Sequence, residues 1–207
     1  MPVCLDKVIW SYAEEWTSAN FKLNTDTVHR YTVLTWKKPI ANFYKLNIDG
    51  TRSSSTGKIG AGGVIRDHFG NWITGFQVNL GIGEIPDVEA WGLLYGLKLA
   101  LSLHISHLEI ESDSAILVQL MQKAVFSLHP LGSLLKGCSN IMDAMGNAQL
   151  SHIFKECNMT ADSLAKNSIN HELGLIIFEY PPVHAAQPYL DDISAVSRAR
   201  RCSCSNS

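Results

Sequence analysis

The chain has 207 residues, 46% of them hydrophobic and 17% charged, and a formal net charge of −2. This length and composition fit one well-buried domain with extensions, or two small domains, rather than a disordered chain. The near-neutral charge argues against a strong binder of DNA or RNA, but it leaves room for a local binding groove.

The first part of the chain predicts a lead-in followed by three strands. Residues 1–40 are expected to be an N-terminal extension or a remnant linker, with a short amphipathic helix in "VIWSYAEEWTSANFK" and an extended stretch ending at Pro39. Strand-like runs follow over about residues 43–49, 59–67 and 71–80, separated by the turn sequences "GTRSSSTGK" and "DHFGN". Such short connections favour an antiparallel meander.

The rest of the chain alternates between helices and strands. The apolar rows of "DVEAWGLLYGLKLALSLH" predict a long helix, and "HLEIES" predicts a strand after it. Helices are expected over about 113–123 and 131–146, then a strand in "QLSHIFKE" and a helix in "TADSLAKNSIN" with Thr160 as its cap. We therefore predict an α/β fold over residues 41–170, with a five-stranded mixed sheet (three antiparallel strands, then two parallel) flanked by helices. Residues 171–207 are expected to be a C-terminal extension with a flexible basic tail.

Two acids stand at the ends of predicted strands. Asp49 follows the alternating "KLNI" and precedes Gly50, so the opening of a turn would explain it without any function. Asp113 follows "LEIES", where it could instead cap the next helix. Glu109 and Glu111 share its parity and should point to the same side of the sheet. We favour Asp113 as the functional acid, because α/β sheets build their sites at the carboxyl ends of strands.

Two further acids are expected in the first turns of helices, where the helix dipole alone favours a negative charge by ~0.3–1 kcal/mol. Glu89 nevertheless heads a row that faces the interior, made of Leu93, Gly96, Ala100 and Leu103. Asp162 lies at the edge of the apolar positions Ala161, Leu164 and Ala165. The position of Glu89 indicates that it faces the interior, because a merely solvating acid would more often sit on the opposite face; Asp162 is expected at the edge of the packed residues.

The order of the four acids along the fold predicts a shared site. They fall on the first strand, the crossover helix, the end of the adjacent parallel strand and the final helix, so in a mixed sheet they can converge. Carboxylates at close range repel and raise one another's pKa, so a cluster of this kind is costly unless cations occupy it. Ligands that offer only oxygen suit Mg²⁺ or Mn²⁺ rather than zinc.

The motifs together resemble a known family. "KLNIDG", "GAGGVIRDHFGNW", "VEAWGLLYGLKLAL", "EIESDS" and "HIFKECNMTADSLA" are similar to the ribonuclease H-like domains of plant genomes, which often derive from non-LTR retrotransposons. The resemblance covers about residues 41–170, and the order of the motifs carries it. It implies a ribonuclease H-like fold and the hydrolysis of RNA in RNA–DNA hybrids by two metal ions.

The resemblance also assigns roles to the acids. It implies that Asp49 bridges two Mg²⁺ ions, that Glu89 and Asp113 complete the shell of one ion, and that Asp162 helps to hold the other. Mn²⁺ is an alternative metal. The hybrid would be recognised through its backbone geometry and ribose 2′-hydroxyls rather than through base edges.

The sequence departs from many relatives in one respect, because "HIFKECNMTAD" leaves no room for a mobile histidine loop before the last acid. His152 is expected to be packed within the last strand rather than catalytic. The basic residues near the expected cleft are few and are expected to be solvated surface; they are Lys45, Lys58, Arg66, Lys155 and Lys166.

Two alternatives to a hybrid-specific nuclease stay open. The first is a non-catalytic module that binds nucleic acid or protein, and the second, less favoured, is an integrase-like nuclease. The five cysteines are scattered and odd in number, which indicates reduced thiols in an intracellular setting, either cytoplasmic or nuclear. No apolar run approaches ~18 residues, so we expect no membrane segment, and we expect a monomer.

Overall fold

The computed structural model describes residues 30–83, 85–123 and 129–202. Residues 33–198 form one compact unit, and residues 1–32 and 199–207 belong to a second unit. Strands β1 (Arg30–Leu34) and β8 (Arg198–Cys202) pair with each other as a separate two-stranded sheet. The helix predicted within residues 8–22 and the last five residues of the basic tail lie outside the described residues.

The main sheet has six strands rather than the five predicted. Their order is β6 (Asn147–His152), β5 (His107–Ser112), β2 (Tyr44–Arg52), β3 (Lys58–Arg66), β4 (Trp72–Ile82) and β7 (Gly174–Phe178). Strands β2, β3, β4 and β7 form antiparallel pairs, whereas β5 runs parallel to both β2 and β6. The added strand β7 comes from the stretch predicted to be an extension, and it pairs with β4 because the edge of the meander offers it an open ladder.

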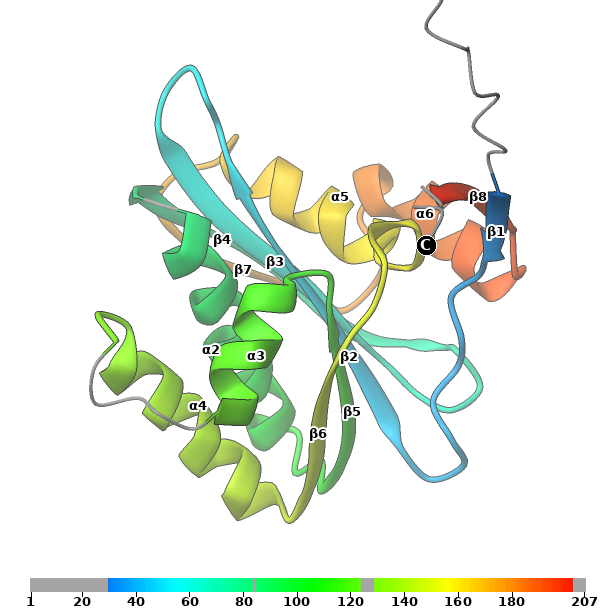
Figure 1. The fold of residues 1–207 in the computed structure, drawn as a ribbon, viewed down its shortest axis with the longest axis horizontal. Helices are drawn as coiled ribbons and strands as arrows, with labels where there is room; N and C mark the ends of the chain where they lie inside the picture. The colour runs from blue at the N-terminus through cyan, green and yellow to red at the C-terminus, as the bar shows by residue number, and fades with distance from the viewer. Residues whose placement is uncertain (1–29, 84, 124–128, 203–207) are drawn as a thin grey trace, which may run out of the picture. The chain divides into compact units, whose positions relative to one another are not determined.

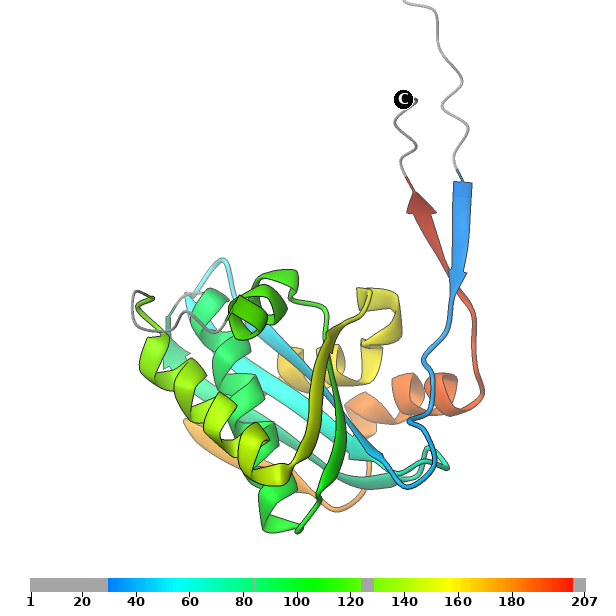
Figure 2. The same cartoon turned by 60° about the horizontal axis from the view of Figure 1, so that its bottom comes forward.

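Helices cover both faces of this sheet (Figure 1). Helices α2 (Ile85–Ser102), α3 (Ala115–Lys123) and α4 (Gly132–Met145) lie on one face, where their apolar residues join the main core. Helices α5 (Met159–Ser168) and α6 (Val183–Ile193) lie on the other, and a short 3₁₀ turn, η1 (Lys155–Cys157), precedes α5. Figure 2 shows the same two layers from a second direction. Among the described helices, none is long and apolar enough to cross a lipid bilayer.

Strand β2 divides its side chains between the two faces. Leu46 and Ile48 are fully buried in the main core, and they lie against Gly96 of α2, where a methyl group would be 2.7 Å from Leu46 Cδ2. Lys45, Asn47 and Asp49 alternate with them and therefore point to the opposite face. The alternation of "KLNID" thus places Asp49 on a strand whose other side is held by the core.

The polar face contains a buried arginine, which corrects the expectation that Arg66 is solvated. Arg66 is 0% exposed, and it donates hydrogen bonds to Asp192 (3.0 Å) and Asn47 (2.6 Å). Its guanidinium lies 3.6 Å from the ring centroid of Trp36. Because Trp36 comes from the predicted lead-in and Asp192 from α6, the segments that flank residues 41–170 pack on the same polar face.

Candidate metal centre

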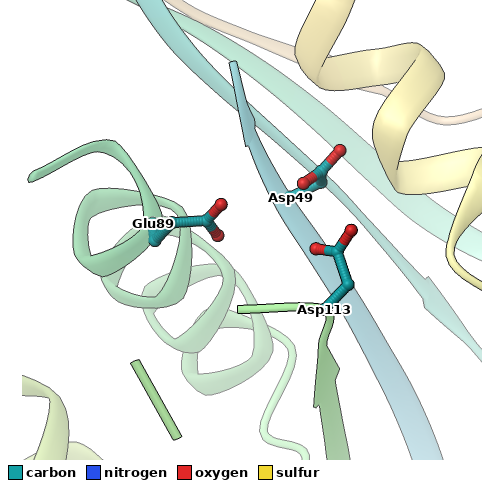
Figure 3. A group of neighbouring side chains, drawn as sticks. All are labelled: Asp49, Glu89 and Asp113. Atoms are coloured by element: carbon teal, nitrogen blue, oxygen red, sulfur yellow. The ribbon is translucent and has the colours of Figure 1, made fainter. Parts of the chain in front are cut away.

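Three of the four predicted acids converge in the structure. One carboxyl oxygen each from Asp49, Glu89 and Asp113 can be chosen so that all three lie within 4.8 Å of one another. The side chains come from β2, from α2 and from the residue just after β5, and Figure 3 shows them directed toward a common space. We call these residues the three-acid group. Asp162 is not a member of it.

Asp49 lies within a strand rather than at a turn. Strand β2 continues to Arg52, and Asp49 pairs with Gly62 of β3. Its Oδ1 accepts a hydrogen bond from the backbone N–H of Gly50 at 2.9 Å, and the residue is 4% exposed. The explanation of Asp49 as a turn-opening residue is therefore wrong, and a buried acid in the middle of a sheet needs another reason.

Gly50 brings Glu89 to the three-acid group. A methyl group at Gly50 would lie 2.6 Å from Val88 Cγ1 and 3.1 Å from Glu89 Cδ, so only glycine lets α2 approach the strand this closely. Glu89 is 8% exposed, and its Oε2 is buried without a hydrogen-bond partner among the described residues. A buried carboxyl oxygen of this kind is costly unless a cation or a donor satisfies it.

Asp113 is not the cap of the helix that follows it. Ser114 has that role, because its hydroxyl accepts a hydrogen bond from the backbone N–H of Leu117 at 3.3 Å. Asp113 is half-buried and directly follows the carboxyl end of β5. The ladder between β2 and β5 ends at the pair Ile48–Ser112, and Asp49 and Asp113 are the next residues along these two segments. Its side chain is thus available to the three-acid group.

The two other acids of β5 are engaged elsewhere. Glu109 and Glu111 both form ion pairs with Lys45, at 3.2 and 2.6 Å, and Glu111 also accepts a hydrogen bond from Asn47 at 2.9 Å. Glu109 and Glu111 point to the same side of the sheet as each other, as their parity predicts. Lys45 is 2% exposed, so it is a buried partner of these acids and not the solvated residue that we expected.

The three-acid group is electrostatically strained. Burial, and then the charges of Asp113, Glu89 and Asp162, raise the pKa of Asp49 to about 9. Burial and the charge of Asp113 raise the pKa of Glu89 to about 7. A divalent cation would remove this penalty by favouring the ionised forms. Because the group offers only oxygen ligands, and one of them has no partner within residues 30–83, 85–123 and 129–202, it fits Mg²⁺ or Mn²⁺.

Asp162 is buried and bound by two lysines. Its Oδ1 lies 2.8 Å from Lys155 Nζ, and its Oδ2 lies 2.7 Å from Lys166 Nζ. Burial by itself would raise the pKa of Asp162, but the hydrogen bonds and charges of the two lysines outweigh it, and the net shift is downward. The contact with Lys166 follows the i,i+4 spacing that can be read from a helix sequence. The contact between Lys155 and Asp162 was not predicted from the sequence.

The segment before α5 has no histidine loop in the described structure. Strand β6 ends at His152, and η1 and α5 follow within a few residues. His152 is exposed and contacts the ring of Phe154 edge-on, with the ring centroids 5.9 Å apart. The prediction that His152 is packed within the sheet is therefore wrong. Thr160 is not a cap either, since it lies inside α5 and donates a hydrogen bond to Asp192 at 2.7 Å.

The comparisons with known proteins agree with this fold. An Arabidopsis thaliana protein named "Putative ribonuclease H protein" is 28% identical over 96% of this chain, and the chain spans about a third (33%) of that relative's length. RNase H1 from the archaeon Halobacterium salinarum superposes with a TM-score of 0.58 at 18% identity, over 62% of this chain and 98% of that one.

A compost-derived RNase H1, solved in complex with an RNA/DNA hybrid, superposes with a TM-score of 0.56 at 24% identity, over 61% of this chain and 96% of that one. These likenesses show the ribonuclease H-like fold. The family model described as "Reverse transcriptase-like" matches residues 47–168, which is more than half of the chain. The chain is therefore a member of the reverse transcriptase-like family, whose domain has the ribonuclease H-like fold.

Proposed function

We propose that this chain is an endonuclease that hydrolyses the RNA strand of RNA–DNA hybrids with divalent metal ions, Mg²⁺ or Mn²⁺. The observation that carries the proposal is the convergence of Asp49, Glu89 and Asp113, with one buried carboxyl oxygen that has no partner in the part of the chain that the structure describes. The family membership and the hybrid bound to a structural neighbour support the choice of substrate.

The roles proposed for the residues follow from their positions. Asp49 stands on β2, and Asp113 directly follows the neighbouring parallel strand β5, whose ladder with β2 ends one residue earlier. Glu89 reaches the same space from α2, which packs closely on Gly50. These three residues would hold a divalent ion, which when bound supplies Lewis-acid stabilisation of phosphate charge and lowers the pKa of a water molecule. Asp162 is proposed to help hold a second ion.

The test is a cleavage assay with purified protein. Labelled RNA–DNA hybrid, single-stranded RNA and duplex DNA are each incubated with Mg²⁺ or with EDTA. We expect metal-dependent cutting of the hybrid alone, lost in Asp49→Asn and Asp113→Asn. Glu109→Gln is the matched control, because Glu109 lies on the same face of β5 but pairs with Lys45. Hybrid cutting that survives both Asn variants would refute the proposal.

One observation favours a second candidate, a non-catalytic module that binds nucleic acid or protein. Both carboxylate oxygens of Asp162 are held by lysines rather than left open toward the three-acid group. Under this alternative, the protein would bind hybrid in a gel-shift assay at low salt but would leave it intact with either metal. The cleavage assay distinguishes the two functions directly.

A further inference from the structure

Asp162 sits among cations that belong to the chain itself. Its side chain is 4% exposed, whereas those of Lys155 and Lys166 are 55% and 60% exposed. Each ammonium contacts a different oxygen of the carboxylate, at 2.8 and 2.7 Å. A buried carboxylate is thus neutralised by two groups whose stems extend into solvent.

The two lysines differ in what else they face. Lys166 lies one turn further along α5 and contacts Asp162 from the same helix. Lys155 comes from η1, outside the helix, and its pKa is raised by the hydrogen bond to Asp162 and then by the charges of Asp162, Asp49 and Asp113. Its charge in turn lowers the pKa of Asp49. Lys155 therefore interacts both with Asp162 and with the three-acid group.

We infer that the ammonium of Lys155 occupies the position at Oδ1 of Asp162 that a second divalent ion would take, so that the chain without nucleic acid binds one divalent ion rather than two. A second ion can join at Oδ1 of Asp162 only when this ammonium moves away, because the ammonium lies 2.8 Å from that oxygen and would repel a divalent ion placed there. The movement is feasible because the Lys155 side chain is more than half exposed. The inference rests on the proposed metal centre and defines Lys155 as a positioning residue that sets ion occupancy.

The experiment counts bound ions without nucleic acid and without any measurement of activity. Mn²⁺ is titrated into the full chain by calorimetry, and bound Mn²⁺ is counted by electron paramagnetic resonance. The wild type should bind one ion tightly. Lys155→Met should bind a second ion at least about tenfold more tightly than the wild type does, because it removes the repulsion between a positive charge and a divalent ion at close range.

Three variants locate the effect. Lys155→Arg keeps the charge and should keep the wild-type count of one ion. Lys166→Met is the matched control, and it should also keep that count, because Lys155 still covers Oδ1 of Asp162. Adding Asp162→Asn to Lys155→Met should remove the second ion and leave the first. Circular dichroism checks folding, and Lys155→Gln serves as a second neutral variant.

The inference would be overturned if the wild type bound two ions with similar affinity, or if both neutral variants left the second-ion affinity within twofold of the wild type. In either case the first ion would still be present, and the proposed metal centre would stand. If neither the wild type nor any variant bound an ion, the metal centre itself would be contradicted, and the proposed function with it. The two failures are therefore distinguishable.

Discussion

Replacing Asp49 by Asn should stabilise the protein in EDTA, and should do so more at pH 8 than at pH 5. The pKa of Asp49 is about 9 in the folded protein and about 3.9 in an unfolded chain. Between these values the folded state binds more protons, so the free energy of unfolding falls as the pH rises toward 9. The stabilisation contributed by protonated Asp49 is complete below about pH 4. It is lost progressively as the pH rises from about 4 to about 9.

The size of the effect follows from the same shift. Three pH units at about 1.36 kcal/mol each give about 4 kcal/mol between pH 5 and pH 8. Because the neighbouring charges of Asp113, Glu89, Asp162 and Lys155 rearrange as Asp49 ionises, we expect about half of this, roughly 2 kcal/mol. An Asn at position 49 does not titrate, so its advantage over the wild type should grow by that amount.

The assay is urea unfolding of both proteins in EDTA at pH 5 and pH 8, followed by tryptophan fluorescence. Asp143→Asn, a change at an exposed acid of α4, is the control and should show no pH-dependent gain. Millimolar Mg²⁺ should stabilise the wild type and not Asp49→Asn. An advantage of Asp49→Asn that is equal at both pH values, or that is larger at pH 5, would refute the electrostatic reasoning.

Four further substitutions test the fold around the site by urea unfolding and Mn²⁺ calorimetry. Gly50→Ala places a methyl carbon 2.6 Å from a valine of α2, so it should lower the free energy of unfolding by about 1–3 kcal/mol and weaken Mn²⁺ binding; unchanged affinity would contradict the close approach. Ser114→Ala removes a helix cap, so it should lower the free energy of unfolding by about 0.5–2 kcal/mol and keep Mn²⁺ binding. Asp113→Asn should keep the stability and weaken Mn²⁺ binding. If instead Asp113→Asn lowered the stability and Ser114→Ala did not, Asp113 would be the cap. Arg66→Met removes the 3.0 Å partner of Asp192, but Arg198 and Thr160 still contact that carboxylate. The loss should therefore be about 1–3 kcal/mol, the cost of one hydrogen bond to a charged group; no measurable loss would count against the Arg66–Asp192 pair.

Local patterns in the sequence were sufficient to predict five of the six strands of the sheet that carries the site. The alternation of Leu46 and Ile48 with polar neighbours placed β2, and the short turns around it defined the meander. The parity of Glu109, Glu111 and Asp113 was also readable, because strands alternate strictly. The sequence did not show which of these acids is free to join the metal centre. That depends on Lys45 of the neighbouring strand, which pairs with Glu109 and Glu111.

The features that sequence analysis missed depend on contacts between distant segments. Arg66 is buried because Asp192, far along the chain, and Trp36 both reach it. The short run "GLIIF" becomes the sixth strand because β4 has a free edge, and nothing in its own pattern distinguishes it from a loop. Lys155 contacts Asp162 because η1 turns the chain back toward α5, and no periodicity predicts such a turn.

The most direct test of the metal centre is a crystal structure of the wild-type chain grown with Mn²⁺, with anomalous scattering used to locate the ions. We predict an ion at about 2.1 Å from carboxyl oxygens of Asp49, Glu89 and Asp113. Saturating Mn²⁺ with no anomalous peak among these three residues, or with ions bound only elsewhere on the surface, would contradict the assignment of this group as the metal centre.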